Sequence, residues 1–191
     1  FASTVGHATA YALNTPRVAM SEVEFKDSDM IGIKCDRTKK TFRKDDIFGG
    51  VEWNAQALSN DVLTGKPSRG FRGIVWKPIH PTFRNVRTMV GFQAGSGALL
   101  TNPHFASVDF AVFMFGTNFY VYENGVERGG YGSYDDRDEI SVVVTSENKI
   151  EYRVNGKARF VSAKTPSFPM HVKIVGYTQG DLVQDVQWIE G

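Results

Sequence analysis

Hydrophobic residues occupy alternate positions through most of the stretch from residue 108 to residue 157. This two-residue period is typical of β-strands. Four such sets follow one another along the chain, at residues 108–114, 119–122, 140–144 and 150–154. Two of these sets are followed by Asn-Gly pairs, at 124–125 and 155–156, and Asn and Gly accept the positive φ of tight hairpin turns. The stretch therefore predicts consecutive antiparallel hairpins with no amphipathic helix between them.

The same pattern recurs in shorter runs on both sides of this stretch. Further strands are predicted around residues 21–25, 30–35, 41–43, 73–77, 88–92, 171–177 and 182–188. Residues 44–72 are the least regular part, and a polar loop is predicted there. Many short strands separated by turn residues are typical of a sandwich or barrel. We expect an all-β fold, an antiparallel β-sandwich of jelly-roll type, with residues 48–191 forming the sandwich.

Residues 1–47 are predicted to form an N-terminal arm and a hairpin packed on that sandwich. Residues 1–20 fit either a strand or extended arm tied to the body, or a loose leader. The chain begins with Phe1 rather than Met, which suggests a processed product or a segment of something larger. Residues 27–35 also resemble residues 136–144; a partial tandem repeat and the general similarity of sandwich hairpins both explain this. In either case both segments should be paired strands.

Composition limits the classes of partner. The 191 residues carry a net charge of +1, so no global field draws the protein towards nucleic acid or an anionic membrane. No apolar run approaches the length of a membrane span. Hydrophobic residues make up 41% of the chain and aromatic residues 13%, enough to fill a sizeable core and to suit half-buried sheet surfaces. We therefore expect a glycan or a protein surface as partner, within or outside a larger complex.

The order of motifs resembles the concanavalin A-like lectin/glucanase superfamily, which includes laminin-G-like and SPRY-like modules. The likeness covers roughly residues 48–190, and it rests on the segments RGIVWKP (72–78), MVGF (89–92), VDFAVF (108–113), FYVYENG (119–125), DRDEI (136–140) and IEYRVNG (150–156). The resemblance implies the jelly-roll fold. It implies no particular ligand, because the superfamily contains lectins, glycosidases and protein-interaction modules.

Catalysis is not expected. The resemblance implies that a glucanase of this superfamily would carry Glu-x-Asp-x-x-Glu on one strand, and the chain has no such run. Glu22 and Glu24 share a strand face but fit an exposed acidic edge better. Cys35 fits a small core residue better than an attacking thiolate. Without further motifs, we predict a non-enzymatic protein with no cofactor.

Metal binding is also not expected. The four histidines, at 7, 80, 104 and 171, lack ligand spacing for zinc. Asp135, Asp136 and Asp138 could supply oxygens to calcium, with Asn118 or Asn102 approaching in space, but a turn hydrogen-bonded to backbone amides explains them more simply.

Aromatic residues beside glycine-rich loops are the best binding candidates, because sugars stack their C–H faces on exposed rings. Tyr131 and Tyr134 lie in such a loop (129–135), and either burial or exposure fits them. Arg128, Asn118 and Trp53 complete the predicted ligand-binding set, whereas Trp76 and Tyr122 fit a core better.

We expect a non-catalytic module that binds glycans through its rim loops. A structural subunit docked in a larger assembly is the alternative, and a degenerate glycosidase is a third.

Overall fold

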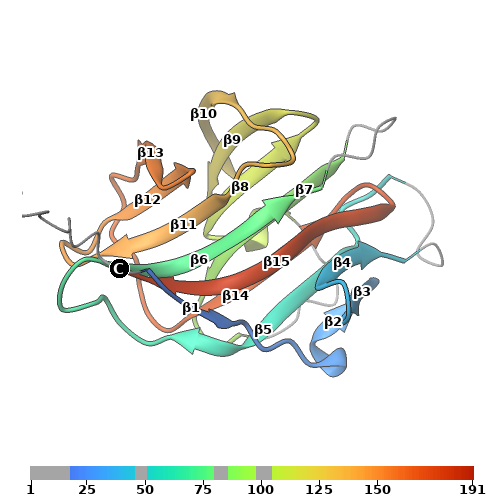
Figure 1. The fold of residues 1–191 in the computed structure, drawn as a ribbon, viewed down its shortest axis with the longest axis horizontal. Helices are drawn as coiled ribbons and strands as arrows, with labels where there is room; N and C mark the ends of the chain where they lie inside the picture. The colour runs from blue at the N-terminus through green and yellow to red at the C-terminus, as the bar shows by residue number, and fades with distance from the viewer. Residues whose placement is uncertain (1–17, 46–50, 80–85, 98–104) are drawn as a thin grey trace, which may run out of the picture.

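The computed structural model describes residues 18–45, 51–79, 86–97 and 105–191. These residues form two antiparallel sheets that pack face to face (Figure 1). The eight-stranded sheet has the order β13-β12-β11-β6-β15-β4-β3, with β1 also paired to β15. The seven-stranded sheet has the order β10-β9-β8-β7-β14-β5-β2. The predicted all-β jelly-roll sandwich is confirmed.

The eight-stranded sheet contains β1 (Ala19–Glu22), β3 (Ile33–Asp36), β4 (Thr41–Lys44), β6 (Phe71–Pro78), β11 (Ile140–Thr145), β12 (Ile150–Val154), β13 (Lys157–Val161) and β15 (Gly180–Glu190). The seven-stranded sheet contains β2 (Met30–Ile31), β5 (Ala55–Leu63), β7 (Arg87–Ala94), β8 (Phe110–Phe115), β9 (Asn118–Glu123), β10 (Val126–Ser133) and β14 (Met170–Gly176). Two short 3-10 turns, η1 (Asp27–Asp29) and η3 (Phe105–Ser107), interrupt the strands.

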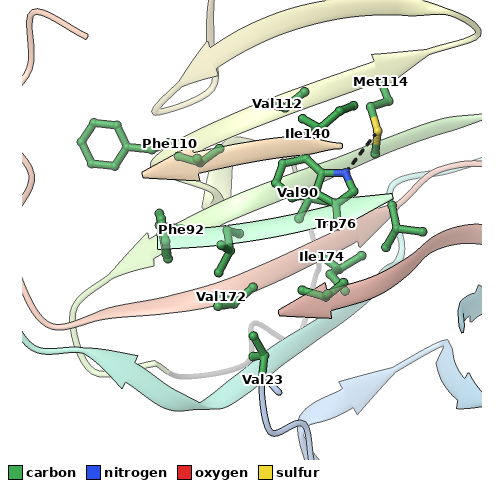
Figure 2. Close-up of a cluster of buried hydrophobic side chains, with 14 of the residues drawn as sticks. Val23, Trp76, Val90, Phe92, Phe110, Val112, Met114, Ile140, Val172 and Ile174 are labelled. Atoms are coloured by element: carbon green, nitrogen blue, oxygen red, sulfur yellow. Dashed lines mark hydrogen bonds between the residues drawn. The ribbon is translucent and has the colours of Figure 1, made fainter. Parts of the chain in front are cut away.

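The core lies between the two sheets and is built by the predicted alternation. Side chains of β8 at 110, 112 and 114 point into it, as do those of β9 at 119 and 121. Trp76 is fully buried there, and its indole N–H is directed at the sulfur of Met114, 3.5 Å away (Figure 2). The prediction that Trp76 belongs to the core is confirmed.

Both Asn-Gly turns form as predicted. Asn124 and Gly125 have φ of 52° and 75°, and Asn155 and Gly156 have φ of 51° and 72°. Two consecutive left-handed residues give the turn whose twist matches a two-residue hairpin. The register around the first turn pairs Val126 with Glu123, so the hairpin of β9 and β10 closes on it directly.

Two strands lie where the sequence predicted loops. β5 occupies nine residues of the region predicted as a polar loop, and it pairs with both β14 and β2. β10 takes up most of the glycine-rich segment predicted as a loop, and two irregularities interrupt its pairing with β9. Both runs are rich in Ala, Asn, Ser or Gly, which disfavour strands intrinsically, but neighbouring strands supply the hydrogen bonds. These two predictions were wrong.

The described part of the N-terminal segment contributes strands to both sheets. β1, β3 and β4 join the eight-stranded sheet and β2 joins the seven-stranded one. Val23 and Phe25, between β1 and η1, are buried in the core. The two segments that resemble each other in sequence are both paired strands, as predicted. The division of the chain at residue 48 stays a prediction, and residues 1–17 lie outside the described residues.

Candidate functional site

The outer side of the seven-stranded sheet carries a continuous group of aromatic side chains. Successive side chains of a strand point to opposite faces of the sheet. The residues that alternate with the core-facing residues in β8 and β9 therefore point away from the core. These outward residues join rings from β14's end, from η3 and from the segment before β5. We call the group the aromatic face; it consists of Trp53, Phe105, Phe113, Phe115, Tyr120, Tyr122 and Tyr177, with Arg87 at its margin.

Phe113 is the centre of the aromatic face. Its ring centroid lies 5.5 Å from that of Tyr122, 5.8 Å from that of Trp53, 5.9 Å from that of Tyr120 and 6.2 Å from that of Phe115. These distances fall within the range of favourable aromatic pairs. All seven rings are partly exposed, and none is buried. A ligand laid across this sheet would therefore meet rings from several strands at once.

Four of the rings pack against a small cluster of buried apolar side chains on the same side of the sheet. Met89, Val108, Ala111 and Val175 form this cluster, and they are almost completely buried beneath the rings of Trp53, Phe105, Phe113 and Tyr122. Packing of this kind restricts ring rotation, so the aromatic face is a preorganised surface.

The side chain of Lys44 links two backbone segments that carry rings of the aromatic face, the segment before β5 and the end of β14. Its side chain is fully buried, and Nζ donates hydrogen bonds to the backbone carbonyls of Glu52, at 2.8 Å, and Tyr177, at 2.9 Å. Burial lowers the pKa of this ammonium group. Glu52 precedes Trp53, and the rings of Trp53 and Tyr177 lie 5.2 Å apart. Lys44 thereby positions this ring pair.

Tyr122 adds a polar contact at the opposite side of the aromatic face. Its hydroxyl donates a hydrogen bond to Oε2 of Glu127, at 2.9 Å. Burial, together with the neighbouring carboxylate, raises the pKa of Tyr122 to about 12, so the phenol stays protonated. The prediction that Tyr122 belongs to the core between the sheets was wrong, because its position in β9 alternates with the core-facing Phe119 and Val121.

The five residues predicted to bind a ligand do not form one site. Trp53 lies in the aromatic face. Arg128 and Tyr131 lie on β10, at an edge of the sandwich. Tyr134 is only 6% exposed and packs in the core, with its hydroxyl donating to the carbonyl of Gly116 at 2.7 Å. Asn118 is exposed at the start of β9 and donates to the carbonyl of Phe115.

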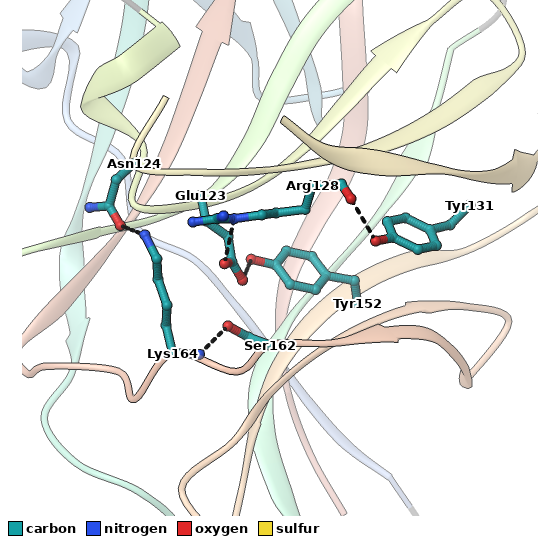
Figure 3. A network of polar contacts seen from close by, with 7 residues as sticks. All are labelled: Glu123, Asn124, Arg128, Tyr131, Tyr152, Ser162 and Lys164. Atoms are coloured by element: carbon teal, nitrogen blue, oxygen red, sulfur yellow. Dashed lines mark hydrogen bonds and ion pairs between the residues drawn. The ribbon is translucent and has the colours of Figure 1, made fainter. Parts of the chain in front are cut away.

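Arg128 and Tyr131 belong to a polar network that joins the two sheets (Figure 3). Glu123 is 2% exposed, and its carboxylate accepts a hydrogen bond from the Tyr152 hydroxyl at 3.2 Å and pairs with Nε of Arg128 at 3.1 Å. The Tyr131 hydroxyl donates to the carbonyl of Arg128. A buried carboxylate needs such partners, so these contacts have a structural purpose first.

The ring of Tyr131 is also engaged across the sandwich edge. It stacks on Phe160 of β13, with centroids 4.8 Å apart and an interplanar angle of 28°. Phe160 in turn lies 5.8 Å from Tyr152. One face of Tyr131 is therefore covered by a protein ring. The binding of a ligand at this rim stays a prediction.

The acidic segment at 135–138 is a hydrogen-bonded turn, as predicted. Oδ1 of Asp135 accepts from the backbone N–H of Arg137, and Oδ2 of Asp138 accepts from the backbone N–H of Asp135. Asp138 also accepts from the amide of Asn155. Within the described part of the chain, no group of three or more His, Cys, Asp or Glu side chains could hold a metal ion. His7, His80, His104 and Asn102 lie outside that part.

Glu22, Glu24 and Cys35, the other residues considered for catalysis, have surroundings that explain them without a catalytic role. Glu22 and Glu24 are both exposed near the edge strand β1, and Glu22 forms an ion pair with Lys40 that lowers its pKa. Cys35 is partly buried and packs against the core, and burial raises the pKa of its thiol. A thiol with a raised pKa is a weak nucleophile.

Two cavities among the described residues lie away from the aromatic face. One of about 690 Å³ adjoins β2 and β3 beside the ion pair of Lys34 with Asp45. A second, of about 150 Å³, lies between β1, β4 and β15. Neither is lined by a group of aromatic rings. No helix in the described residues has the length and apolar character needed to cross a bilayer.

Sequence reasoning missed six of the seven rings of the aromatic face as binding candidates. The usable signal was the spacing in β8 and β9: Phe113 and Phe115 lie two residues apart in β8, Tyr120 and Tyr122 lie two residues apart in β9, and Phe113 pairs with Tyr120. The two-residue period places all four on one side of the sheet. Which side faced the core remained open, because β8 is apolar at every position.

Comparison with known proteins identifies the fold class. No family model matches the chain, and no curated protein matches it. Among solved structures, the chain is similar to the PSpry domain of TRIM65 (TM-score 0.59, 8% identity, covering 86% of this chain and 91% of that one). It is also similar to the SPRY domain of human HERC1 (TM-score 0.55, 12% identity, 86% and 96%). The metal-free carbohydrate recognition domain of Emp46p is a further match (TM-score 0.56, 10% identity, 85% and 88%).

The protein therefore has the concanavalin A-like jelly-roll fold. At these identities the likeness extends to the fold alone. The matched structures just named are described as SPRY domains and as a carbohydrate recognition domain.

Proposed function

We propose that this protein is a non-catalytic carbohydrate-recognition module that binds through its aromatic face. The observation that carries the proposal is the continuous set of partly exposed rings centred on Phe113. Pyranose rings present apolar C–H groups that pack on aromatic rings, and rigid rings lose little conformational entropy on binding. A face whose rings come from several strands suits a chain-like glycan better than a small molecule, which needs a concave pocket.

Two further observations support this function. The Emp46p domain, which is described as a carbohydrate recognition domain, shares the fold over 85% of this chain. Lys44 and the buried cluster beneath the rings hold the face in a fixed shape, which reduces the entropic cost of binding.

A glycan array with three variants tests the proposal. Trp53→Ala and Tyr120→Ala each remove one partly exposed ring of the aromatic face, and we expect each to weaken sugar binding at least tenfold. Arg128→Gln changes the rim at β10 and should leave that binding intact. Thermal unfolding of each variant confirms that the sandwich is still folded. Binding that is lost in Arg128→Gln but kept in both ring variants would move the site to the rim.

Docking to a protein is the second candidate function. The rings of Phe113 and Tyr122 meet at 87°, and those of Trp53 and Phe113 at 62°, so neighbours cover part of each other's faces. Trp, Tyr and Arg are also the residues enriched at protein-binding hot spots. Copurification of a stoichiometric complex that Trp53→Ala disrupts, with no signal on the glycan array, would favour this function.

A further inference from the structure

We propose that the ligand of the aromatic face is an acidic saccharide, and that Arg87 binds the carboxylate of a uronic acid residue. This inference rests on the proposed function and specifies its ligand class. It starts from the position of Arg87 at the first residue of β7, beside the end of β14.

Arg87 is held in place by aromatic rings. The guanidinium carbon lies 4.5 Å from the ring centroid of Phe115 and 5.2 Å from that of Tyr177. Both distances are within the range of cation–π attraction. The backbone of Arg87 is fixed as well, since its N–H donates to Thr178 Oγ1 at 2.9 Å and its carbonyl accepts from the N–H of Tyr177 at 3.0 Å. The cation is therefore preorganised.

The N–H groups of this guanidinium have no acceptor among the described residues. No carboxylate oxygen of the described chain lies within 4.0 Å of it, and no described oxygen accepts a hydrogen bond from its nitrogens. A guanidinium offers five N–H donors in a planar fork that matches a carboxylate. A half-buried arginine with unused donors at the margin of a binding face is suited to an anionic group of the ligand.

A second arginine shows what a satisfied arginine looks like in the same fold. Arg153 also lies over a ring, with its guanidinium carbon 4.3 Å from the centroid of Phe71. Its Nη2 and Nε, however, both donate hydrogen bonds to Oε2 of Glu151, at 2.7 and 2.8 Å. Arg153 is thus neutralised within the protein. Arg87 has no such partner among the described residues, which makes Arg153 a matched control.

The surroundings of Arg87 place its charge where a sugar carboxylate would lie. Tyr177 connects it to Trp53, whose ring is 5.2 Å from that of Tyr177. A pyranose stacked on this ring pair would direct a substituent towards the guanidinium. One acidic side chain that contacts the face, Glu127, belongs to β10, three strands from β7, or roughly 14 Å away at ordinary strand spacing. Repulsion from Glu127 is therefore weak at Arg87.

Calorimetric titration with matched sugars tests the inference. The probes are hexasaccharides of galacturonate and of mannuronate, each with the neutral hexasaccharide obtained by reducing its carboxylates to hydroxymethyl groups. We expect the protein to bind at least one charged hexasaccharide about tenfold or more tightly than its neutral counterpart, since a charge-assisted pair contributes that much. Arg87→Gln should abolish the difference in affinity between the charged and the neutral hexasaccharide. Arg153→Gln should keep the difference.

Each other outcome overturns the inference in a recognisable way. Equal affinity for charged and neutral sugars, or a preference that survives in Arg87→Gln, refutes the role of Arg87 and leaves the carbohydrate function standing. Tight binding of a polyglutamate peptide with the same dependence on Arg87 would show that the partner is an acidic protein segment. Absence of binding to these hexasaccharides and to every sugar on the glycan array refutes the proposed function itself.

Discussion

Individual side chains in this sandwich are hard to assign from sequence when the strand is apolar on both faces. β8 reads FAVFMF, so Phe113 and Val112 are indistinguishable by hydrophobicity, yet one faces the core and the other the aromatic face. A one-residue change of register exchanges the two faces. Tyr134, whose burial the sequence left open, is only 6% exposed although glycines and aspartates surround it in the sequence. Trp53 was the one predicted ligand residue in the aromatic face.

The buried ammonium group of Lys173 gives a prediction at this scale. Lys173 is fully buried on β14, where Nζ donates to Gln93 Oε1 at 2.5 Å. Burial lowers its pKa from 10.5 to about 8. The unfolded chain then binds more protons than the folded one between pH 8 and about 10.5. Because stability rises with pH in such a window, wild type should gain up to roughly 3 kcal/mol across it.

Urea unfolding at several pH values between 7 and 10.5 measures this contribution. The free energy of unfolding of the wild type is compared with that of Lys173→Met, and the difference removes the titration of tyrosines and of other lysines. At pH 7 the variant should have the higher free energy of unfolding, because the wild type buries a charged ammonium group. We expect this difference to shrink steadily above pH 8, where the ammonium group of the folded wild type loses its proton. Lys149→Met, at an exposed position, should show no such trend. A difference between wild type and Lys173→Met that stays constant with pH would contradict the prediction.

At the scale of elements, strands with strong turn signals were predictable and strands without them were not. The Asn-Gly pairs marked two hairpins correctly, because the left-handed conformation selects those residues locally. β5 has no comparable signal: its run AQALSNDVL is polar and small, and β14 and β2 on either side make it a strand. Such pairing is a long-range effect that a local pattern does not contain.

The two Asn-Gly turns allow a matched test of how a turn supports the aromatic face. Gly125 and Gly156 have nearly the same positive φ, 75° and 72°. A Cβ at Gly125 would lie 2.7 Å from the Cβ of Ala106, next to Phe105, whereas nothing lies within 4 Å of one at Gly156. Gly156→Ala should therefore cost only the left-handed strain of about 1–2 kcal/mol.

Gly125→Ala should cost more and should also disturb η3. We expect a lower free energy of unfolding than in Gly156→Ala and a change in the fluorescence of Trp53, whose ring lies 5.7 Å from that of Phe105. Urea unfolding and emission spectra of the native state measure both effects. Equal losses of stability in the two variants, with an unchanged spectrum, would mean that η3 yields freely and does not couple the turn to the aromatic face.

For the whole molecule, the resemblance to concanavalin A-like modules predicted the fold correctly but located the sandwich only in residues 48–190. The structure places strands of residues 18–45 in both sheets. Fold recognition depended on the central hairpins, whose register is local, whereas the N-terminal strands join through pairing with β15 and β5, far along the chain. The convergence of Trp53, Phe105 and Tyr177 on the aromatic face was missed for the same reason, since these three rings come from segments distant in sequence.

The contribution of the N-terminal strands to the whole sandwich can be measured by truncation. A chain starting at residue 48 lacks β1 to β4, so it loses the partners of one side of β15 and of β5 and the buried side chains of Val23, Phe25 and Phe42. Burying each such side chain contributes about 1.5–3 kcal/mol, and two unpaired strand edges favour aggregation. With total stabilities of 5–15 kcal/mol typical of domains, we expect this chain to be unfolded or aggregated.

A chain starting at residue 18 keeps all four strands and serves as the control. If the shorter chain unfolds cooperatively at the temperature of the control in a circular dichroism melt, residues 48–191 are a complete sandwich and the N-terminal strands are an accessory to it.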